Sequence, residues 1–377
     1  MEPPVQPVLA MALPGIGPSL LALLAEQAAA LGIAKVALVG GAVRDGLLHH
    51  VHRDPWRGCP DLDFVVEGDA VALAEALLLR VGSERMPRLQ THPAYGTAEL
   101  EIDGLVLDLA SARRESYPSP GANPLVTLGD LESDLDRRDF SVNAMAMVLG
   151  EASMEAGLID FHEGSKDLES RELAFLHSGS VVDDPTRVVR AARYAARLGF
   201  TLSSDALAQV ARGVQEWPWT WRSGDPANAA PPALSTRFRM ELELLFAKEP
   251  WSHALQFLED WGAFPLLDPQ LQNDPRRMLR LRRAARLGLP LLPALLLGAC
   301  APLEVAERLQ LPLQQIRWLE QVQEIFIWFG SDAMQAQAIS WTPVDWTESL
   351  ERQGWSAEAV ALAVAGSERH WRPLLRW

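Results

Sequence analysis

Two aspartates separated by one residue, Asp61 and Asp63, are the side chains of this sequence best suited to chemistry. In an extended segment, residues two apart point to the same face, so the two carboxylates would converge on one point. Converging carboxylate oxygens suit a magnesium ion. The pair by itself is usually a solvated strand edge or a turn, so its meaning depends on the surrounding sequence.

The segment before this pair, residues 36–45, reads Val-Ala-Leu-Val-Gly-Gly-Ala-Val-Arg-Asp. Its apolar run predicts a buried strand, Gly40-Gly41 predicts a tight turn, and a helix is expected to begin near Ala42. The first N–H groups of such a helix can bind phosphate oxygens. The sequence therefore predicts that a phosphate site and a metal site lie close together.

A third carboxylate, Asp108, stands in the strand-like run 105–109, where it is surrounded by apolar residues and the alternation of polar and apolar residues is lost. We therefore expect Asp108 to be buried. An unpaired buried carboxylate is costly, so a bound cation is one explanation. An ion pair with Arg113 or Arg114 is the alternative.

Length and composition describe a globular chain of two or three domains, with 377 residues of which 48% are hydrophobic. Cys59 and Cys300 are far apart and have no metal-ligand spacing, which favours a reducing cytoplasm over a disulfide framework or a zinc site. Prolines interrupt the uncharged run 287–303, and the N-terminus has no basic region before an apolar core. We expect neither a signal peptide nor a membrane span.

The net charge of −15 argues at first against a nucleic-acid partner, but binding depends on where the cations cluster. Arg276, Arg280 and Arg283 would share one helix face, which could follow a phosphate backbone. A solvated helix face paired with acidic neighbours is the alternative. The arginines of the two clusters are Arg187, Arg190, Arg193 and Arg197, and then Arg276, Arg277, Arg280, Arg282, Arg283 and Arg286.

The order of patterns along the chain separates two halves. Short β-like runs alternate with helical runs over residues 35–149, and from residue 168 onward the pattern is almost wholly helical. Helices are expected over residues 20–30 and 235–248, and the Trp- and Pro-rich stretch 216–233 reads as a loop or insertion. An α/β head followed by a helical half is the expected arrangement.

Five motifs, in this order, resemble those of the class II tRNA nucleotidyltransferases. These are the CCA-adding enzymes, with their poly(A) polymerase relatives, in the polymerase-β-like superfamily. The resemblance covers roughly the first two-thirds of the chain. The motifs lie at residues 40–45, 61–63, 108–115, 137–144 and 183–191.

The resemblance implies an α+β fold with three parts. Residues 1–150 would form a polymerase-β-like α/β catalytic head with a mixed β-sheet. Residues 151–215 would form an all-α neck that recognises the nucleotide base, and residues 216–377 a helical body and tail that bind tRNA. One departure is the stretch 49–60, which is longer than the usual connection in the family. Its three histidines lack an obvious fourth ligand, so a polar loop is expected there.

The resemblance also implies roles for individual residues. Asp61, Asp63 and Asp108 would be the catalytic carboxylates and hold Mg²⁺, a cation that prefers oxygen ligands. By type, an arginine suits triphosphate oxygens, an aspartate can accept from a ribose hydroxyl, and an asparagine can serve either. The residues expected to bind the nucleotide are Gly40, Gly41, Arg44, Arg138, Asp139, Asn143, Asp184, Arg187 and Arg190.

Asp184 is well placed to cap a helix in which Pro185 occupies the first position. Asp184 and Arg187, three apart, would offer an acceptor and a forked donor side by side, which can match the Watson–Crick edge of cytosine or adenine. In the family this role belongs to a Glu-Asp-x-x-Arg motif, and here Asp183 stands in place of the glutamate. Simple capping with an Asp183–Arg187 pair, worth only ~0.3–0.5 kcal/mol, is the alternative.

The function implied by the resemblance is template-free addition of C and A to the tRNA 3′ end from CTP and ATP. The reaction would be a two-metal nucleotidyl transfer that releases pyrophosphate. Enzymes that add only CC or only A, and poly(A) polymerases, share the same motifs. A non-catalytic RNA-binding protein on this scaffold and a nucleotidyltransferase acting on small molecules are alternatives from other classes.

Overall fold

The computed structural model describes residues 13–58, 61–149, 157–331 and 340–367. The chain divides into two compact units, which we describe separately. Unit 1 comprises residues 1–118, 124–180 and 200–206, and unit 2 comprises residues 119–123, 181–199 and 207–377. Cys59, named above, lies outside the described residues.

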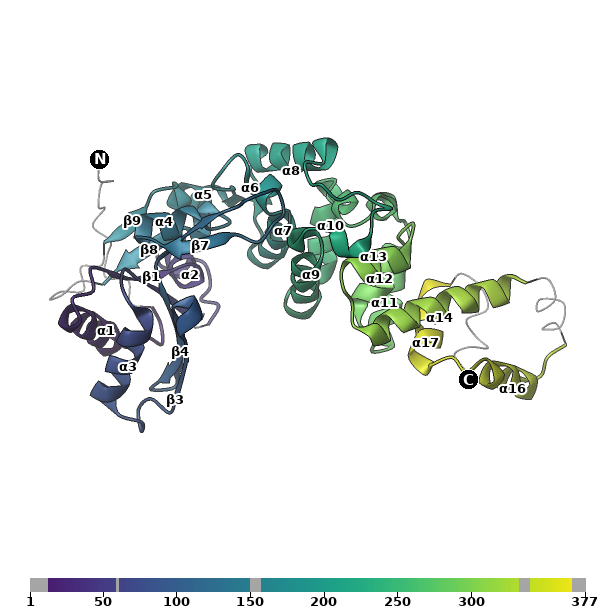
Figure 1. Ribbon diagram of the computed structural model, residues 1–377, viewed down its shortest axis with the longest axis horizontal. Coiled ribbons are helices and arrows are strands. Elements are labelled where there is room, and N and C mark those ends of the chain that lie inside the picture. The colour runs from purple at the N-terminus through teal and green to yellow at the C-terminus, as the bar shows by residue number, and fades with distance from the viewer. Residues whose placement is uncertain (1–12, 59–60, 150–156, 332–339, 368–377) are drawn as a thin grey trace. The chain divides into compact units, whose positions relative to one another are not determined.

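Unit 1 is built on a seven-stranded mixed sheet with the strand order β3-β4-β5-β2-β1-β8-β9 (Figure 1). Within it, β2 and β5 are parallel and the other neighbouring strands are antiparallel. The α+β class and the mixed sheet expected of the head are confirmed. The strands are β1 Val36–Val39, β2 Leu62–Val66, β3 Arg88–His92, β4 Thr97–Ile102, β5 Leu105–Ser111, β8 Met145–Val148 and β9 Leu158–Asp160.

Successive side chains of a strand point to opposite faces of the sheet. Helices of unit 1 pack against the sheet and bury apolar side chains there. Helices α1 (Pro18–Ala30) and α3 (Ala70–Val81) lie side by side, and α3 packs on β3, β4 and β5 (Figure 1). Helix α4 (Leu131–Asp136) contributes Leu131 and Leu135 to a core cluster that also contains alternate residues of β1. Two further helices of unit 1 are α2 (Gly41–His50) and α5 (Gly164–Ser170).

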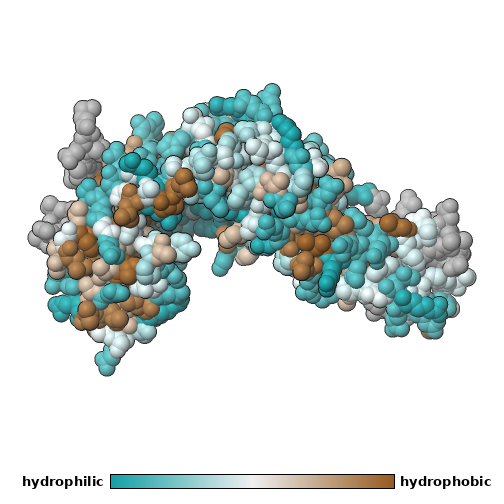
Figure 2. Space-filling model, viewed as in Figure 1, coloured by the Kyte–Doolittle hydropathy of each residue, from teal (hydrophilic) through white to brown (hydrophobic). Residues whose placement is uncertain are grey.

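Two small sheets complete the strand inventory of the described chain. Strands β6 (Arg113–Ser116) and β7 (Leu125–Leu128) form an antiparallel pair, and β10 (Glu172–Leu173) pairs in parallel with β11 (Thr201–Leu202). The side chains of β7 are exposed. The space-filling view shows a mainly hydrophilic surface with hydrophobic patches on the head (Figure 2).

The described chain is almost entirely helical from residue 180 onward, later than the expected residue 168, because strand β10 lies between the two positions. Within unit 2, α7 packs on α9 and α10, α11 packs on α12 and α17, and α14 packs on α17. In the described parts of the chain, no helix has both the length and the apolar composition needed to cross a bilayer. The helices are α6 Ser180–Asp183, α7 Thr186–Leu198, α8 Ser204–Glu216, α9 Thr236–Lys248, α10 Trp251–Asp260, α11 Arg277–Arg286, α12 Leu291–Leu296, α13 Pro302–Arg308, α14 Leu313–Gly330, α16 Pro343–Gln353 and α17 Ala357–Gly366.

The Trp-rich stretch between α8 and α9 has the expected irregular backbone, with only two short 3₁₀ turns. It is nevertheless well packed. Trp219 and Trp221 are buried, and the indole N–H of Trp219 donates to the carbonyl of Val182 at 2.9 Å. The guanidinium of Arg308 lies over the ring of Trp221 at 4.7 Å. These tryptophans anchor the stretch to unit 2 and are not exposed to stack on bases.

Candidate active site

The turn between β1 and α2 brings the start of a helix next to a carboxylate. Gly40 has φ 69° and ψ −134°, a conformation that essentially only glycine adopts. A Cβ on Gly40 would lie 3.2 Å from Nη1 of Arg138 and 3.6 Å from Oδ2 of Asp63. Helix α2 then begins at Gly41, one residue before the expected start. The absence of a side chain at Gly40 therefore lets the first turn of α2, Arg138 and Asp63 come together.

Three carboxylates form a row across neighbouring strands. Asp63 on β2 is opposite Asp108 on β5, and Asp108 is opposite Glu99 on β4. Residues in register on adjacent strands point to the same face of a sheet, only about 5 Å apart. Asp61 lies just before β2 and is exposed. The row thus combines two of the aspartates expected at the site with Glu99, which the sequence analysis did not identify.

The pKa values of Asp63 and Asp108 reflect burial and repulsion between carboxylates. Burial raises the pKa of Asp63 to about 6; the Asp108 and Asp61 carboxylates act in the same direction, and Arg138 opposes them. The pKa of Asp108 is also raised, first by partial removal from water and then by the Glu99 and Asp61 carboxylates. Arg138 therefore does not fully offset the effects of burial and of the neighbouring carboxylates on Asp63.

The expectation that Asp108 is buried is wrong. Strand β5 does alternate: Leu107 and Leu109 are buried, whereas Val106 and Asp108 are exposed. The apolar side chain of Val106 on the exposed face hides this alternation in the sequence. The alternative ion pair is not formed either, since in the described residues Arg113 pairs with Glu115 and the side chain of Arg114 bonds to that of Ser133.

The carboxylate row fits a divalent cation that substrate phosphates help to hold. Among the described residues, no group of three or more His, Cys, Asp or Glu side chains is arranged to hold a metal ion by itself. Magnesium is typically bound through one or two carboxylates together with substrate phosphates, and not in an all-protein cage. Asp63 and Asp108 provide such a partial set of hard oxygen ligands, with a charge that a cation would neutralise.

A buried polar chain links α2 to the 3₁₀ turn Ser141–Asn143. The guanidinium of Arg44 donates to Asp45 at 2.8 Å and to Oδ1 of Asn143 at 2.7 Å. Asn143 in turn donates through Nδ2 to Oδ1 of Asp139 at 3.1 Å. Arg44, Asn143 and Asp139 are all buried. These hydrogen bonds hold α2 and the 137–144 motif together.

Arg138 is oriented by a carboxylate that the sequence analysis missed. Its guanidinium donates to Asp134 at 3.1 Å and to the carbonyl of Asn143 at 3.3 Å. Asp134, which is 0% exposed, also pairs with Arg137 at 2.7 Å. Because Asp134 lies in α4 outside the recognisable motifs, only its spacing of three and four residues from the two arginines could have identified it.

Asp184, Arg187 and Arg190 belong to unit 2, whereas the other residues expected at the site belong to unit 1. Asp184 is 5% exposed, and its Oδ1 accepts from the backbone N–H of Thr186 at 3.1 Å and from its hydroxyl at 2.6 Å. The aspartate thus satisfies the start of α7 as expected, although α7 begins at Thr186 with Pro185 at the cap position. The other oxygen of Asp184 forms an ion pair with Arg237 on α9.

Most of the first arginine cluster is paired within unit 2. Arg190 and Arg193 form ion pairs with Glu241, and Arg197 forms one with Glu249. For these three arginines, pairing with acidic neighbours is what the structure shows, and the acids come from α9 and the residue after it. Arg187 is 6% exposed. The cluster therefore joins α7 to α9.

Comparisons with known proteins agree with the fold and the motifs. Residues 36–174 match the family described as the poly(A) polymerase head domain. The chain is 45% identical over 166 residues to an A-adding tRNA nucleotidyltransferase of Aquifex aeolicus. This matched segment makes up 44% of this chain and 19% of the relative. The chain is 42% identical over 234 residues to a CC-adding tRNA nucleotidyltransferase of Deinococcus radiodurans, over 62% of this chain and 55% of that one.

Among solved structures, a CCA-adding enzyme without ligand superposes with a TM-score of 0.71 at 26% identity, over 96% of this chain and 82% of the other. The chain therefore shares with this CCA-adding enzyme a mixed-sheet head followed by helices. The head is thus similar to the poly(A) polymerase head domain, and a larger part of the chain is similar to tRNA nucleotidyltransferases. The chain spans 19% and 55% of the lengths of the two curated relatives named above.

Proposed function

We propose that this chain adds nucleotides from CTP and ATP to the 3′ end of tRNA without a template and releases pyrophosphate. The observation that carries the proposal is the register of Asp63 with Asp108, in a row of carboxylates beside the Gly40 turn. A protein that only binds RNA has no need of such a charged row, whose members repel one another. The names of the relatives, which are A-adding and CC-adding enzymes, support tRNA as the substrate.

In this proposal the chain has three functional parts. Residues 1–150 carry the chemistry, residues 151–215 select the base, and residues 216–377 bind tRNA. The tRNA substrate would locate the protein in the cytoplasm. The carboxylate row and the Gly40 turn support the first assignment.

We assign Mg²⁺ binding to Asp61, Asp63 and Asp108. When bound, the cation would neutralise developing charge on the attacking and leaving oxygens. The exposure of Asp108 supports assigning it to the side of the incoming tRNA hydroxyl, whereas Asp63 is next to the Gly40 turn.

The triphosphate is assigned to the first turn of α2 and to Arg138. The free N–H groups of that turn and the arginine fork are both donors to phosphate oxygens. Asp139 and Asn143 are assigned to the ribose, and Arg44 orients Asn143 through their 2.7 Å hydrogen bond. The close approach of Gly40 to Arg138 supports a shared role for these two elements.

Base selection is assigned to Asp184 and Arg187. An acceptor and a forked donor at this spacing can match cytosine or adenine. The burial of both side chains supports the assignment, because a hydrogen bond discriminates between bases more strongly where water is excluded. Arg190 is assigned a supporting position, since it pairs with Glu241.

The number of nucleotides added is tested with purified tRNAs that end at the discriminator base, at C, and at CC. Each is incubated with Mg²⁺ and with CTP, ATP or both. We expect completion of CCA on all three. Addition of C alone or of A alone would assign the chain to one of the partial reactions that its two curated relatives are named for. Absence of incorporation on every tRNA would refute the proposal.

A further inference from the structure

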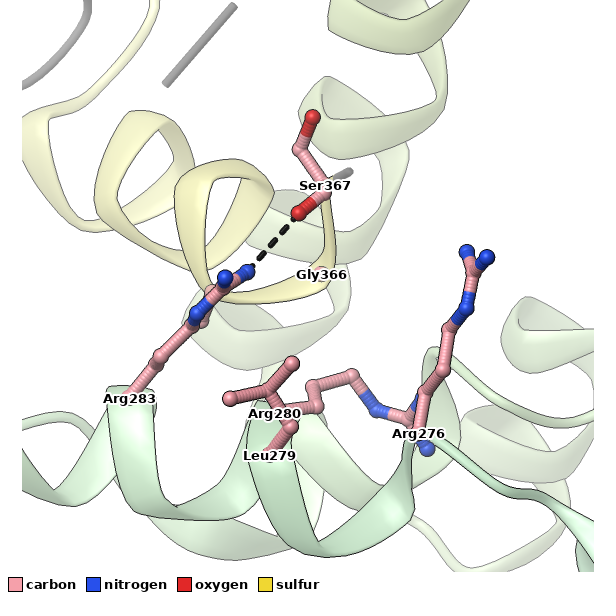
Figure 3. A pocket seen from close by; sticks show the side chains of 7 residues that line it. Arg276, Leu279, Arg280, Arg283, Gly366 and Ser367 are labelled. Atoms are coloured by element: carbon pink, nitrogen blue, oxygen red, sulfur yellow. Dashed lines mark hydrogen bonds between the residues drawn. The ribbon is translucent and has the colours of Figure 1, made fainter. Parts of the chain in front are cut away.

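A pocket in unit 2 has a strongly cationic lining. It has a volume of about 270 Å³ and lies between α11 and the end of α17 (Figure 3). Its lining consists of Arg276, Arg280 and Arg283, together with Leu279 and the backbone turn 365–367. None of these lining residues is acidic. On a chain with a net charge of −15, three arginines around one hollow form a local exception.

One of the three arginines is built into the wall. Arg280 is 5% exposed, and its guanidinium pairs with Asp274 at 2.5 Å and donates to the carbonyls of Ala294 and Leu295. These bonds hold its side chain in one orientation. Its charge is largely balanced by Asp274, so Arg280 shapes the pocket more than it attracts an anion.

The other two arginines flank the opening on either side of Gly366, as Figure 3 shows. Arg283 donates through Nη1 to the carbonyl of Ser367 at 2.8 Å, and four of the five N–H groups of its guanidinium take no part in that bond. Arg276 is exposed at the cap position of α11. A pair of guanidinium groups about one pocket suits the planar, multidentate recognition of phosphate.

The size and frame of the pocket restrict its occupant. Small-molecule sites usually measure roughly 300–1,000 Å³, so this pocket fits one phosphate group with part of its sugar better than a complete nucleoside triphosphate. A Cβ on Gly366 would come within 3.0 Å of the Leu297 side chain, so α17 and its surroundings are closely packed. Leu279, 52% exposed at the rim, offers an apolar surface to a ribose.

We propose that this pocket binds a backbone phosphate of the tRNA substrate. The inference rests on the proposed function, and it goes further by naming the residues that hold the RNA in the helical half. The chain as a whole repels a polyanion, so productive binding needs cations concentrated at particular points. Arg276 and Arg283 provide one such point, on a scaffold fixed by Arg280.

The test uses the full chain and compares arginines of one helix. Arg276→Gln and Arg283→Gln remove charge from the pocket, whereas Arg282→Gln removes the same charge from an exposed position of α11 that does not line it. The dissociation constant of tRNA is measured for each at several salt concentrations. We expect each pocket variant to weaken tRNA binding several-fold and to reduce the salt slope by about one, with little change in Arg282→Gln.

Two controls separate this inference from the function on which it rests. The KM for CTP should stay unchanged in the pocket variants, and their melting temperatures should show that α11 and α17 remain folded. Equal losses of tRNA affinity in Arg276→Gln and Arg282→Gln would indicate a general effect of charge and overturn the proposed role of the pocket. Unchanged tRNA binding, combined with loss of stabilisation by inorganic phosphate, would assign the pocket to a free anion instead. If the pocket assignment fails but the wild-type chain still extends tRNA, the proposed function stands. If the wild-type chain does not bind tRNA at all, both the pocket assignment and the proposed function are wrong.

Discussion

Arg237 on α9 forms an ion pair with Asp184, the carboxylate that precedes α7. It also reaches the carbonyl of Ala122 at 3.5 Å. Since the other oxygen of Asp184 accepts two hydrogen bonds from Thr186, the carboxylate is held from both sides. The group assigned to base selection is therefore pre-oriented by a residue that lies far from every recognisable motif.

Replacing Arg237 with methionine should relax the choice of nucleotide. Without the arginine, Asp184 keeps its bonds to Thr186 but loses the partner that fixes its second oxygen. We expect the preference for CTP and ATP over UTP and GTP to fall by about tenfold, equivalent to about 1.4 kcal/mol of discrimination. Incorporation of the four nucleotides on one tRNA measures it.

Arg239→Met is the matched control, because Arg239 lies on the same helix and bonds to Glu243 and the backbone of residue 310 instead. Equal selectivity in wild type and Arg237→Met would show that the ion pair is only structural. A parallel loss in Arg239→Met would point to a general disturbance of α9.

Asp63→Asn should abolish incorporation while making the metal-free protein more stable at neutral pH. Its raised pKa means that the folded state disfavours the ionised carboxylate. The cost is absent well below pH 3.8, grows as pH rises from the ordinary value of 3.8 to about 6, and is complete above that. Full ionisation costs at most about 3 kcal/mol. Thermal unfolding at pH 4 and pH 8 compares the two proteins.

The two unfolding temperatures should be similar at pH 4, and the asparagine variant should be higher at pH 8. Magnesium should reverse the difference at pH 8, because it stabilises only the ionised wild-type site. A Mg²⁺-dependent rise of the same size in Asp63→Asn would contradict the assignment of this carboxylate to the metal.

The two glycines before α2 should respond differently to alanine. Gly40→Ala forces a Cβ into a backbone region with φ 69° and within 3.2 Å of Arg138, at a cost of about 1–3 kcal/mol. A Cβ on Gly41 would be in ordinary contact with Arg44 at 3.5 Å, and alanine there should leave stability unchanged or slightly improved. Denaturant unfolding of both variants measures the contrast, and equal effects would rule out the conformational argument.

Arg44→Met should lower both stability and nucleotide affinity. The change leaves Asn143 and Asp45 without their guanidinium partner, at a cost of about 2–4 kcal/mol in a buried setting. The KM for CTP should rise, since Asn143 loses its orientation. Arg85→Met, which breaks an exposed pair with Asp103, should change neither quantity noticeably. An unaltered KM in Arg44→Met would limit the polar chain to a structural role.

Local features of this chain were readable from its sequence because each depends on neighbouring residues. The apolar run, the glycine pair and α2 appear where expected, and helices expected over residues 20–30 and 235–248 are found at Pro18–Ala30 and Thr236–Lys248. Contacts between distant segments were not readable. Glu99 faces Asp108 only through strand register, and Arg237 meets Asp184 only through helix packing.

The misjudged burial of Asp108 has the same origin. An apolar residue on the exposed face of β5, Val106, made the strand look uniformly buried, although the structure shows ordinary alternation. For the arginines after residue 187, the sequence did not show which acidic residues pair with them. Their sequence shows a cationic run, but the glutamates that pair with Arg190 and Arg197 come from a segment some fifty positions away.

The turn between β4 and β5 has a consequence for the whole carboxylate row. Asp103 and Gly104, with φ of 51° and 80°, form the two-residue loop of this hairpin, so that Ile102 pairs with Leu105 and Glu99 with Asp108. A one-residue insertion or deletion in the turn would shift the register and send one strand's side chains to the opposite face. The turn thus acts as a parity constraint: homologous hairpins that keep both acids on this face should differ in length by even numbers of residues.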